Sequence, residues 1–498
     1  MDVPPMVDPS LVALGEEQRK LAPACLVALV DAGGVAEVRT YGHPRLDDAP
    51  TRRETVFRLA SLSKSFLAAV ALGLRDEGRL DLHAPIAEYV PGAVLRYDGA
   101  AVPVTSAQLL SNSSGLPEDN AWADRHLGAS VAEIDTLARA GLRLTRPPGT
   151  AYQYSNLGQS LVGRAVEAVT GQAVEDVIRE RLLDPLGLVN TRFHAEDYPA
   201  GADLAWGFRT FDQGAGFSPE PYVGSGAMAC TGGLFSTVDD LAAWIRFLAS
   251  AFAGDPADPG LLAPASRREL QFGRTPIPLG GEPVDERLDA RGYGYGLKVE
   301  LDRRFGRVVS HAGGLPGFSA DMRWHAATGL GVVLFANADG FNKGQRLSEK
   351  VLYDVLESID APADHVRPWP ETLRAAQAVD QAVRTGAPLA DLGDLLSSNL
   401  LPDVPDEVRR SRRDALLTES GPILPDQAPF PGRILTSADP AALRWRIACD
   451  HGALVVDVRL APLAAPLLQT VTVSLADASG RKPQAEPPAI ADHVRVAL

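Results

Sequence analysis

Two short apolar runs near the start of the chain set the first structural prediction. Residues 25–30 and 35–41 are rich in β-formers, and the tetrapeptide Asp-Ala-Gly-Gly lies between them at positions 31–34. Glycines take the positive φ angles of tight hairpin turns without strain, so this pattern predicts a β-hairpin. A sheet therefore begins in the N-terminal part of the chain.

The next strong pattern is helical. Residues 66–74 are alanine- and leucine-rich and apolar nearly all round, which is typical of a buried central helix, with residues 61–64 as its first turn. From residue 84 to about 250 the pattern stays helical, with polar loops. Strand patterns return at residues 293–301, 308–310, 322–324 and 331–336. Strands at both ends with helices between them predict a sheet assembled from distant parts of the sequence.

The C-terminal part has a different character. Residues 362–370 are dense in proline and predict a linker. A helical stretch with the basic run 409–413 follows, and then come strand-like segments at 443–447, 454–460 and 470–475. The basic run favours a solvated helix face over a binding patch. We therefore expect a catalytic-sized domain over residues 1–365 and an accessory helical plus β domain over 366–498, which is a structural or oligomerisation module.

Composition excludes several classes of protein. With 45% hydrophobic and 22% charged residues the chain resembles a globular protein, and its formal charge of -15 repels nucleic acid and anionic lipid. No run approaches the roughly 18 apolar residues of a membrane-spanning helix. Three dispersed cysteines and the absence of a signal-peptide pattern indicate reduced thiols and a cytoplasmic location.

A serine and a lysine start the buried helix. Ser61 and Lys64 are three residues apart, so they share a helix face. A serine is a poor nucleophile until a base removes its proton, and a lysine whose charge is disfavoured by burial can do so near neutral pH. This pair is a candidate nucleophile and base.

Two further motifs follow in the chain. Tyr154 and Asn156 stand in a loop that leads into a helix, where a phenol can relay a proton and an amide can orient a lysine or bind a substrate amide. His311 comes at the end of a predicted strand and is followed by Ala312, Gly313 and Gly314. Glycines there let the strand approach a ligand and leave N–H groups free. Taken singly, each motif is also explained by capping, packing or a turn, whereas their joint order favours a catalytic set.

The three motifs together resemble the active-site serine enzymes of the penicillin-recognition type. The chain is similar to the class C β-lactamase, D-aminopeptidase and D-alanyl carboxypeptidase branch, peptidase family S12, over about residues 20–360. Flanking segments at 57–60, 109–117, 148–149 and 232–241 agree with it. The resemblance implies an α+β fold, an α/β-sandwich, with a central antiparallel sheet and a helical subdomain.

The resemblance also implies roles. Ser61 would be the acylated nucleophile, Lys64 its proton acceptor and Tyr154 the group that hands the proton to the leaving group. Asn156 would bind the substrate's acyl amide, and His311 would support proton transfer or substrate binding. The N–H groups of Ser61 and Gly314, beside Gly313, would form the oxyanion hole.

The expected activity is hydrolysis of small esters, amides or D-amino-acid-containing peptides through an acyl-enzyme. His311 stands where many relatives carry a lysine, and a neutral imidazole attracts a substrate carboxylate less strongly. That difference disfavours a β-lactamase, whereas an H-x-G motif is found among both D-aminopeptidases and D-alanyl carboxypeptidases of the family and does not choose between them. D-alanyl carboxypeptidase or β-lactamase activity and a non-catalytic binding protein of the same fold stay alternatives. No cofactor is expected, and the expected partner is a small molecule or a short peptide. The sequence leaves open whether the chain forms a homo-oligomer.

Other hydrolase classes lack their motifs here. The sequence has no G-x-S-x-G of the α/β-hydrolases and no H-E-x-x-H of the zinc peptidases.

Overall fold

The computed structural model describes residues 21–212, 214–253, 260–279, 286–339, 344–476 and 494–496. The chain forms two compact units. The first contains the residues up to 301 together with 307–361, and the second contains 302–306 and the residues from 362 onward. Within the described ranges, no helix has the length and apolar character that crossing a bilayer requires.

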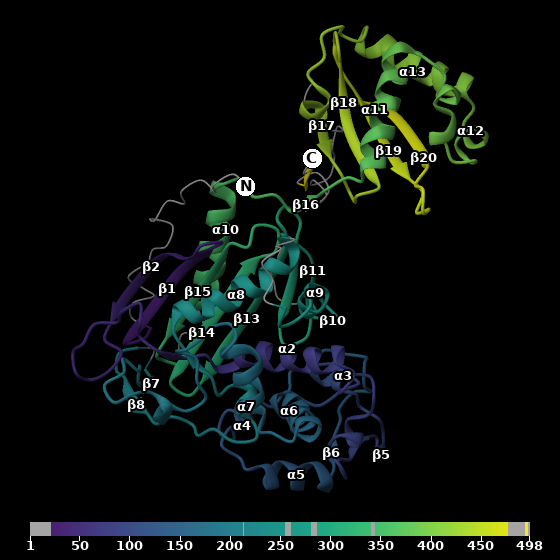
Figure 1. The fold of residues 1–498 in the computed structure, drawn as a ribbon. Coiled ribbons are helices and arrows are strands. Elements are labelled where there is room, and N and C mark those ends of the chain that lie inside the picture. The colour runs from purple at the N-terminus through teal and green to yellow at the C-terminus, as the bar shows by residue number, and fades with distance from the viewer. Residues whose placement is uncertain are drawn as a thin grey trace. The chain divides into compact units, whose positions relative to one another are not determined.

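An eight-stranded sheet is the framework of the first unit (Figure 1), and its strand order is β10-β11-β12-β13-β14-β15-β1-β2. Strand β1 pairs antiparallel with β2 and with β15, so the predicted hairpin and the predicted joining of distant segments are confirmed. The strands are β1 (Ala24–Asp31), β2 (Gly34–Gly42), β10 (Thr275–Pro276), β11 (Leu288–Tyr293), β12 (Lys298–Asp302), β13 (Gly306–Leu315), β14 (Phe318–His325) and β15 (Gly331–Ala336).

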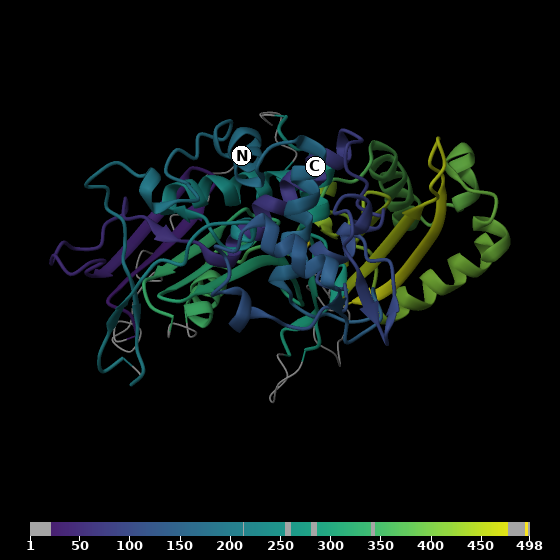
Figure 2. The ribbon, with the colours of Figure 1, turned by 90° about the horizontal axis from the view of Figure 1, so that it is seen from below.

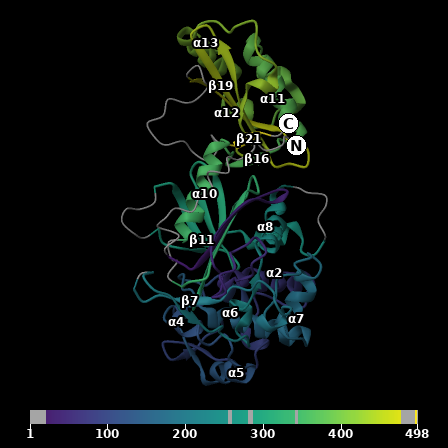
Figure 3. The ribbon, with the colours of Figure 1, turned by 90° about the vertical axis from the view of Figure 1, so that its left-hand side faces the viewer.

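Helices cover both faces of this sheet. Helices α8 (Val238–Ala253) and α10 (Gly344–Ser358) both contact β14 and β15, and Figure 3 shows them on opposite sides of the strands. Successive side chains of a strand point to opposite faces. Accordingly Asp321 bonds to Ser348 of α10, whereas Met322 joins the core on the other face. Coverage on both sides explains why β1 and β15 are apolar nearly throughout, whereas β14 alternates between apolar side chains and buried polar ones such as Asp321.

The predicted buried helix is confirmed. Helix α2 (Ser63–Asp76) is buried along most of its length and contacts α6 (Asn156–Thr170) and α7 (Val174–Ile178) in the helical part of the first unit. The turn before it differs from the expectation, because Ala60–Leu62 forms a separate 3₁₀ turn.

Two strand predictions needed correction. Residues 293–301 were expected to form one strand, but β11 ends at Tyr293 and β12 begins at Lys298. Gly296, at the turn between them, has a φ of +69°, and a Cβ there would lie 2.5 Å from the backbone oxygen of Lys64. The chain turns here because it must pass close to α2. The second correction concerns the His311 motif, which was expected at the end of a strand but lies inside β13.

The second unit is a four-stranded sheet with helices beside it, visible in Figure 2 as yellow strands and green helices. Helix α11 contacts β18 and β19, and α13 contacts β19 and β20. The predicted strands are confirmed. The elements are α11 (Pro370–Thr385), α13 (Asp406–Ser420), β17 (Ile434–Thr436), β18 (Ala442–Cys449), β19 (Gly452–Leu460) and β20 (Leu468–Ala476).

Two further predictions for the C-terminal part were wrong in detail. The proline-rich segment 362–370 is not a plain linker, since β16 (Asp364–Val366) pairs with β21 (Val494–Val496) and Pro370 starts α11. In the basic run, Arg410 is exposed as expected. Arg409, however, donates to three backbone carbonyls, and Arg413 donates to the carbonyl of Val383. These two guanidinium groups hold α13 in place.

Candidate active site

Ser61 lies on a strained turn that several hydrogen bonds fix. Ala60, just before it, has a φ of +50°, a left-handed conformation that costs a non-glycine residue about 1–3 kcal/mol. The Ser63 hydroxyl donates to the Ala60 carbonyl at 2.8 Å and accepts the backbone N–H of Leu234 at 3.2 Å. The surrounding backbone therefore holds the turn in a conformation that it would not adopt alone.

Lys64 lies beside this serine and is fully buried. Its Nζ is 3.0 Å from the Ser61 Oγ and 2.7 Å from the carbonyl oxygen of Thr231. Burial lowers the pKa of Lys64 to about 7, although the charges of Asp124 and Asp119 raise it. A large share of the lysine is therefore neutral at pH 7. A neutral amine can donate to Thr231 while its lone pair faces the serine hydroxyl.

Tyr154 closes the other side of the serine. The Lys64 Nζ lies 5.1 Å from the centre of its ring. Burial raises the pKa of Tyr154 well above its usual value, and a hydrogen bond with Ser61 lowers it. The phenol therefore keeps its proton and contacts the candidate nucleophile.

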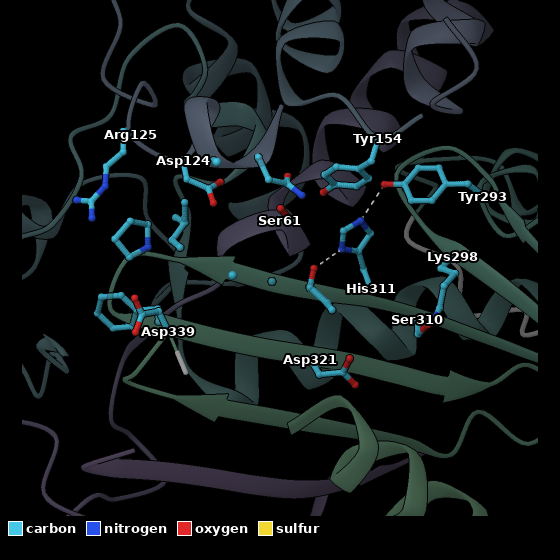
Figure 4. Close-up of a pocket in the computed structure, with 18 of the residues that line it drawn as sticks. Ser61, Asp124, Arg125, Tyr154, Tyr293, Lys298, Ser310, His311, Asp321 and Asp339 are labelled. Carbon is cyan, nitrogen blue, oxygen red and sulfur yellow. Dashed lines mark hydrogen bonds between the residues drawn. The ribbon is translucent and has the colours of Figure 1, made fainter. Parts of the chain in front are cut away.

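His311 is neutral and its tautomer follows from its partners. Its Nδ1 is 2.7 Å from the carbonyl oxygen of Ala312, and its Nε2 is 2.8 Å from the Tyr293 hydroxyl (Figure 4). A carbonyl only accepts, so Nδ1 carries the proton and Nε2 accepts the phenolic O–H of Tyr293. Burial, together with the charge of Lys64, lowers the pKa of His311 to about 3.

Tyr293 is a site residue that the sequence did not reveal. Its ring packs edge-on against Tyr154, with ring centres 6.1 Å apart. Burial raises the pKa of Tyr293 well above its usual value. The side-chain amides of Gln159 and Asn112 partly counteract this rise. The amide nitrogens of these two residues have no hydrogen-bond partner among the described residues. The pattern Gly-Tyr-Gly-Tyr-Gly at 292–296 marks a close-packed turn, but nothing in it indicates a link to His311.

Asn156 is near the site, but its amide does not line the pocket. Its Nδ2 donates to the side-chain oxygens of Asn120 at 2.8 Å and Asp119 at 3.2 Å. Asn120 lines the pocket instead. Asp119 also accepts the backbone N–H groups of Asn156 and Leu157 and so caps helix α6.

The two glycines of the strand motif have different surroundings. A Cβ on Gly313 would lie 2.3 Å from the backbone oxygen of Leu59, so this glycine lets β13 approach the turn that carries Ser61. A Cβ on Gly314 would meet nothing within 4 Å. Gly314 is exposed and therefore borders open space.

These residues surround one cavity of about 660 Å³ (Figure 4). Ser61, Tyr154, His311, Gly313 and Gly314 line it, while Lys64 and Asn156 lie behind the wall. Across the described ranges, no three His, Cys, Asp or Glu side chains are grouped so that they could hold a metal ion. The arrangement suits acyl transfer to a serine hydroxyl.

A family model for Beta-lactamase matches residues 15–356. The chain belongs to the beta-lactamase family. Unguisins hydrolase ungD' of Aspergillus campestris is 27% identical over 323 residues, which are 63% of this chain and 58% of that protein. The chain thus spans only about 60% of the length of the curated relatives that it matches.

Solved structures confirm the expected β-lactamase/transpeptidase fold. The octameric penicillin-binding protein homologue from Pyrococcus abyssi has a TM-score of 0.59 at 20% identity and covers 94% of this chain and 92% of its own. A D-stereospecific amidohydrolase from Streptomyces sp. has a TM-score of 0.52 at 22% identity and covers 69% of this chain and 98% of its own. This beta-lactamase family member therefore belongs to a family of serine hydrolases.

The contrast between the two glycines gives a testable prediction. We expect Gly313→Ala to lower the free energy of unfolding of the first unit by about 1–3 kcal/mol, because β13 or the Ser61 turn must move. Gly314→Ala, which faces open space, should change it by less than about 0.5 kcal/mol. Denaturant unfolding of the two variants checks this, and equal effects would contradict the close approach.

Proposed function

We propose that this beta-lactamase family member hydrolyses small esters, amides or D-amino-acid-containing peptides through an acyl-enzyme at Ser61. The observation that carries the proposal is the 3.0 Å separation of the Ser61 hydroxyl from a buried lysine whose pKa is about 7. A lysine with that pKa supplies an uncharged base at neutral pH.

The proposed acylation step uses a nucleophile, a base, two backbone donors and a proton donor for the leaving group. The Lys64 amine takes the proton of the Ser61 hydroxyl as Oγ attacks the substrate carbonyl. The N–H groups of Ser61 and Gly314 bind the oxyanion that forms, an interaction worth about 3–4 kcal/mol per donor in related chemistry. Tyr154 then gives its proton to the leaving group and recovers one from the Lys64 ammonium. Water reverses the sequence to release the acid.

His311 and Asn156 act as positioning residues in this proposal. His311 holds no charge near pH 7, and its two nitrogens are engaged by Ala312 and Tyr293. Its ring packs 6.1 Å from that of Tyr154, so it orients the phenol. Asn156 acts through Asn120, which reaches the pocket.

Several features favour neutral esters and amides over the alternative substrates. A β-lactamase or D-alanyl carboxypeptidase binds a substrate carboxylate, yet the pocket cations Lys298 and Arg209 already pair with Glu300 and Asp339. The fold shared with a D-stereospecific amidohydrolase supports amides. A non-catalytic binding protein would have no need for a buried lysine beside the serine, since that burial costs stability.

The C-terminal domain, the oligomeric state and the location of the protein are also part of the proposal. The domain over residues 366–498 would be a structural or oligomerisation module, and the octameric homologue from Pyrococcus abyssi supports a homo-oligomer. A cytoplasmic location stays a prediction, in keeping with three buried free cysteines.

Covalent labelling tests the proposal directly. After exposure to a fluorophosphonate and to p-nitrophenyl butyrate, intact-mass spectrometry should show one added group on the wild type and none on Ser61→Ala. The control Ser358→Ala, on helix α10, should label like the wild type. An unmodified wild-type protein without turnover of esters, D-amino-acid amides, peptidyl-D-alanine or β-lactams would contradict it.

The pKa of Lys64 predicts the pH dependence. Only the neutral amine accepts a proton, so kcat/KM for a neutral ester should rise with pH through about 7 and level off above it. At one pH unit below the pKa, about a tenth of the plateau rate is expected. His311 should not contribute, because its pKa is about 3. A rate that is constant between pH 6 and 8 would rule out Lys64 as the titrating base.

A further inference from the structure

The charged side chains that line the pocket do not all have partners. Five of the six charged lining residues that the structure describes make ion pairs. The sixth, Asp124, has neither an ion pair nor a side-chain hydrogen bond within the described part of the chain. These five residues make four ion pairs, because Arg209 and Asp339 pair with each other. The pairs are Arg125–Glu220, Arg209–Asp339, Lys298–Glu300 and Asp321–Arg323.

Asp124 points into the cavity. It follows helix α4 (Asn120–Ala123), and Figure 4 shows its carboxylate directed toward the region of Ser61 while the side chain of Arg125 extends away. Asp119, at the other end of α4, differs because its carboxylate accepts from the hydroxyl of Ser155 and the backbone N–H groups that it caps. Asp119 is structural, whereas Asp124 has unused acceptor capacity.

The surroundings of Asp124 favour a cation. Burial raises the pKa of Asp124 to about 6, the charges of Asp119 and Glu118 raise it further, and Lys64 and Arg125 lower it. The group is therefore mostly ionised at pH 7 and poorly solvated. About half of Lys64 is neutral at that pH. Arg125 already pairs with Glu220. An arriving ammonium would give this carboxylate the charge-assisted hydrogen bond that it lacks.

We propose that Asp124 binds a primary ammonium on the acyl part of the substrate, so that the preferred substrates are esters and amides of amino acids with a free amine. This inference rests on the proposed function of Ser61. Tyr154 and His311 lie on one side of Ser61 and Asp124 on the other (Figure 4). Because Tyr154 protonates the leaving group in the proposed mechanism, the Asp124 side receives the acyl part.

The test compares matched esters at pH 7.5 on the full-length protein. The substrates are the methyl esters of D- and L-alanine, the same esters with an N-acetyl group, and p-nitrophenyl butyrate. We expect kcat/KM for one free-amine alanine ester to exceed that of its N-acetyl form at least tenfold. In Asp124→Asn this ratio should fall by about tenfold, since one charged hydrogen bond is lost. Butyrate hydrolysis should change less than about threefold.

Two variants act as controls. Asp124→Glu keeps the charge and should retain much of the ratio. Glu118→Gln removes an exposed carboxylate that adds to the same field but does not line the pocket, so it should leave the ratio unchanged. Circular dichroism confirms the folding of each variant.

Three outcomes would overturn the inference. The first is a wild type that prefers the N-acetyl esters, and the second is an unchanged ratio in Asp124→Asn. The third is an equal loss on the amine esters and on butyrate, which would mean that Asp124 acts through Lys64. If Ser61 of the wild type stays unmodified and the protein turns over neither butyrate nor any alanine ester, the proposed function itself fails, and the inference fails with it.

Discussion

The burial of one amine beside one hydroxyl is the constraint on which the site depends. An ammonium group removed from water is costly, and a group in that position lowers the cost by releasing its proton. Lys64 has no exposed surface, and its Nζ contacts the Ser61 hydroxyl and the carbonyl of Thr231. The same burial that destabilises the charged lysine makes it a base at neutral pH, so the stability cost and the proposed chemistry have one origin.

Keeping water away from this amine requires close approaches of backbone segments that are distant in sequence. Gly313 brings β13 against the turn that carries Ser61, and Gly296 brings the turn between β11 and β12 against the backbone of Lys64. A side chain at either position would force the segments apart. The antiparallel sheet, to which the pairing of β1 with β15 joins the N-terminal hairpin, supplies the rigid support for both contacts.

The sequence predicted those parts of the fold and site that depend on local pattern. The hairpin, the buried helix and the pair Ser61 and Lys64 follow from apolar runs, glycines and helix spacing. Residues whose role depends on tertiary contacts were missed. Tyr293 acts through a hydrogen bond to His311 across the sheet, and Asp124 is distinguished only by the partner that it lacks. The position of Asn156 was predicted, but not that neighbouring side chains would occupy its amide donors.

The central claim is that Lys64 titrates near neutrality, and the most direct measurement is its pKa by NMR. The chain has six lysines, so protein labelled with ¹³C at lysine Cε gives few signals, and Lys64→Arg assigns the one of interest. We predict a midpoint at pH about 7 for Lys64. A midpoint near the usual lysine value, about 10.4, would contradict the account, because the amine beside Ser61 would then be charged at the pH where it must act as a base.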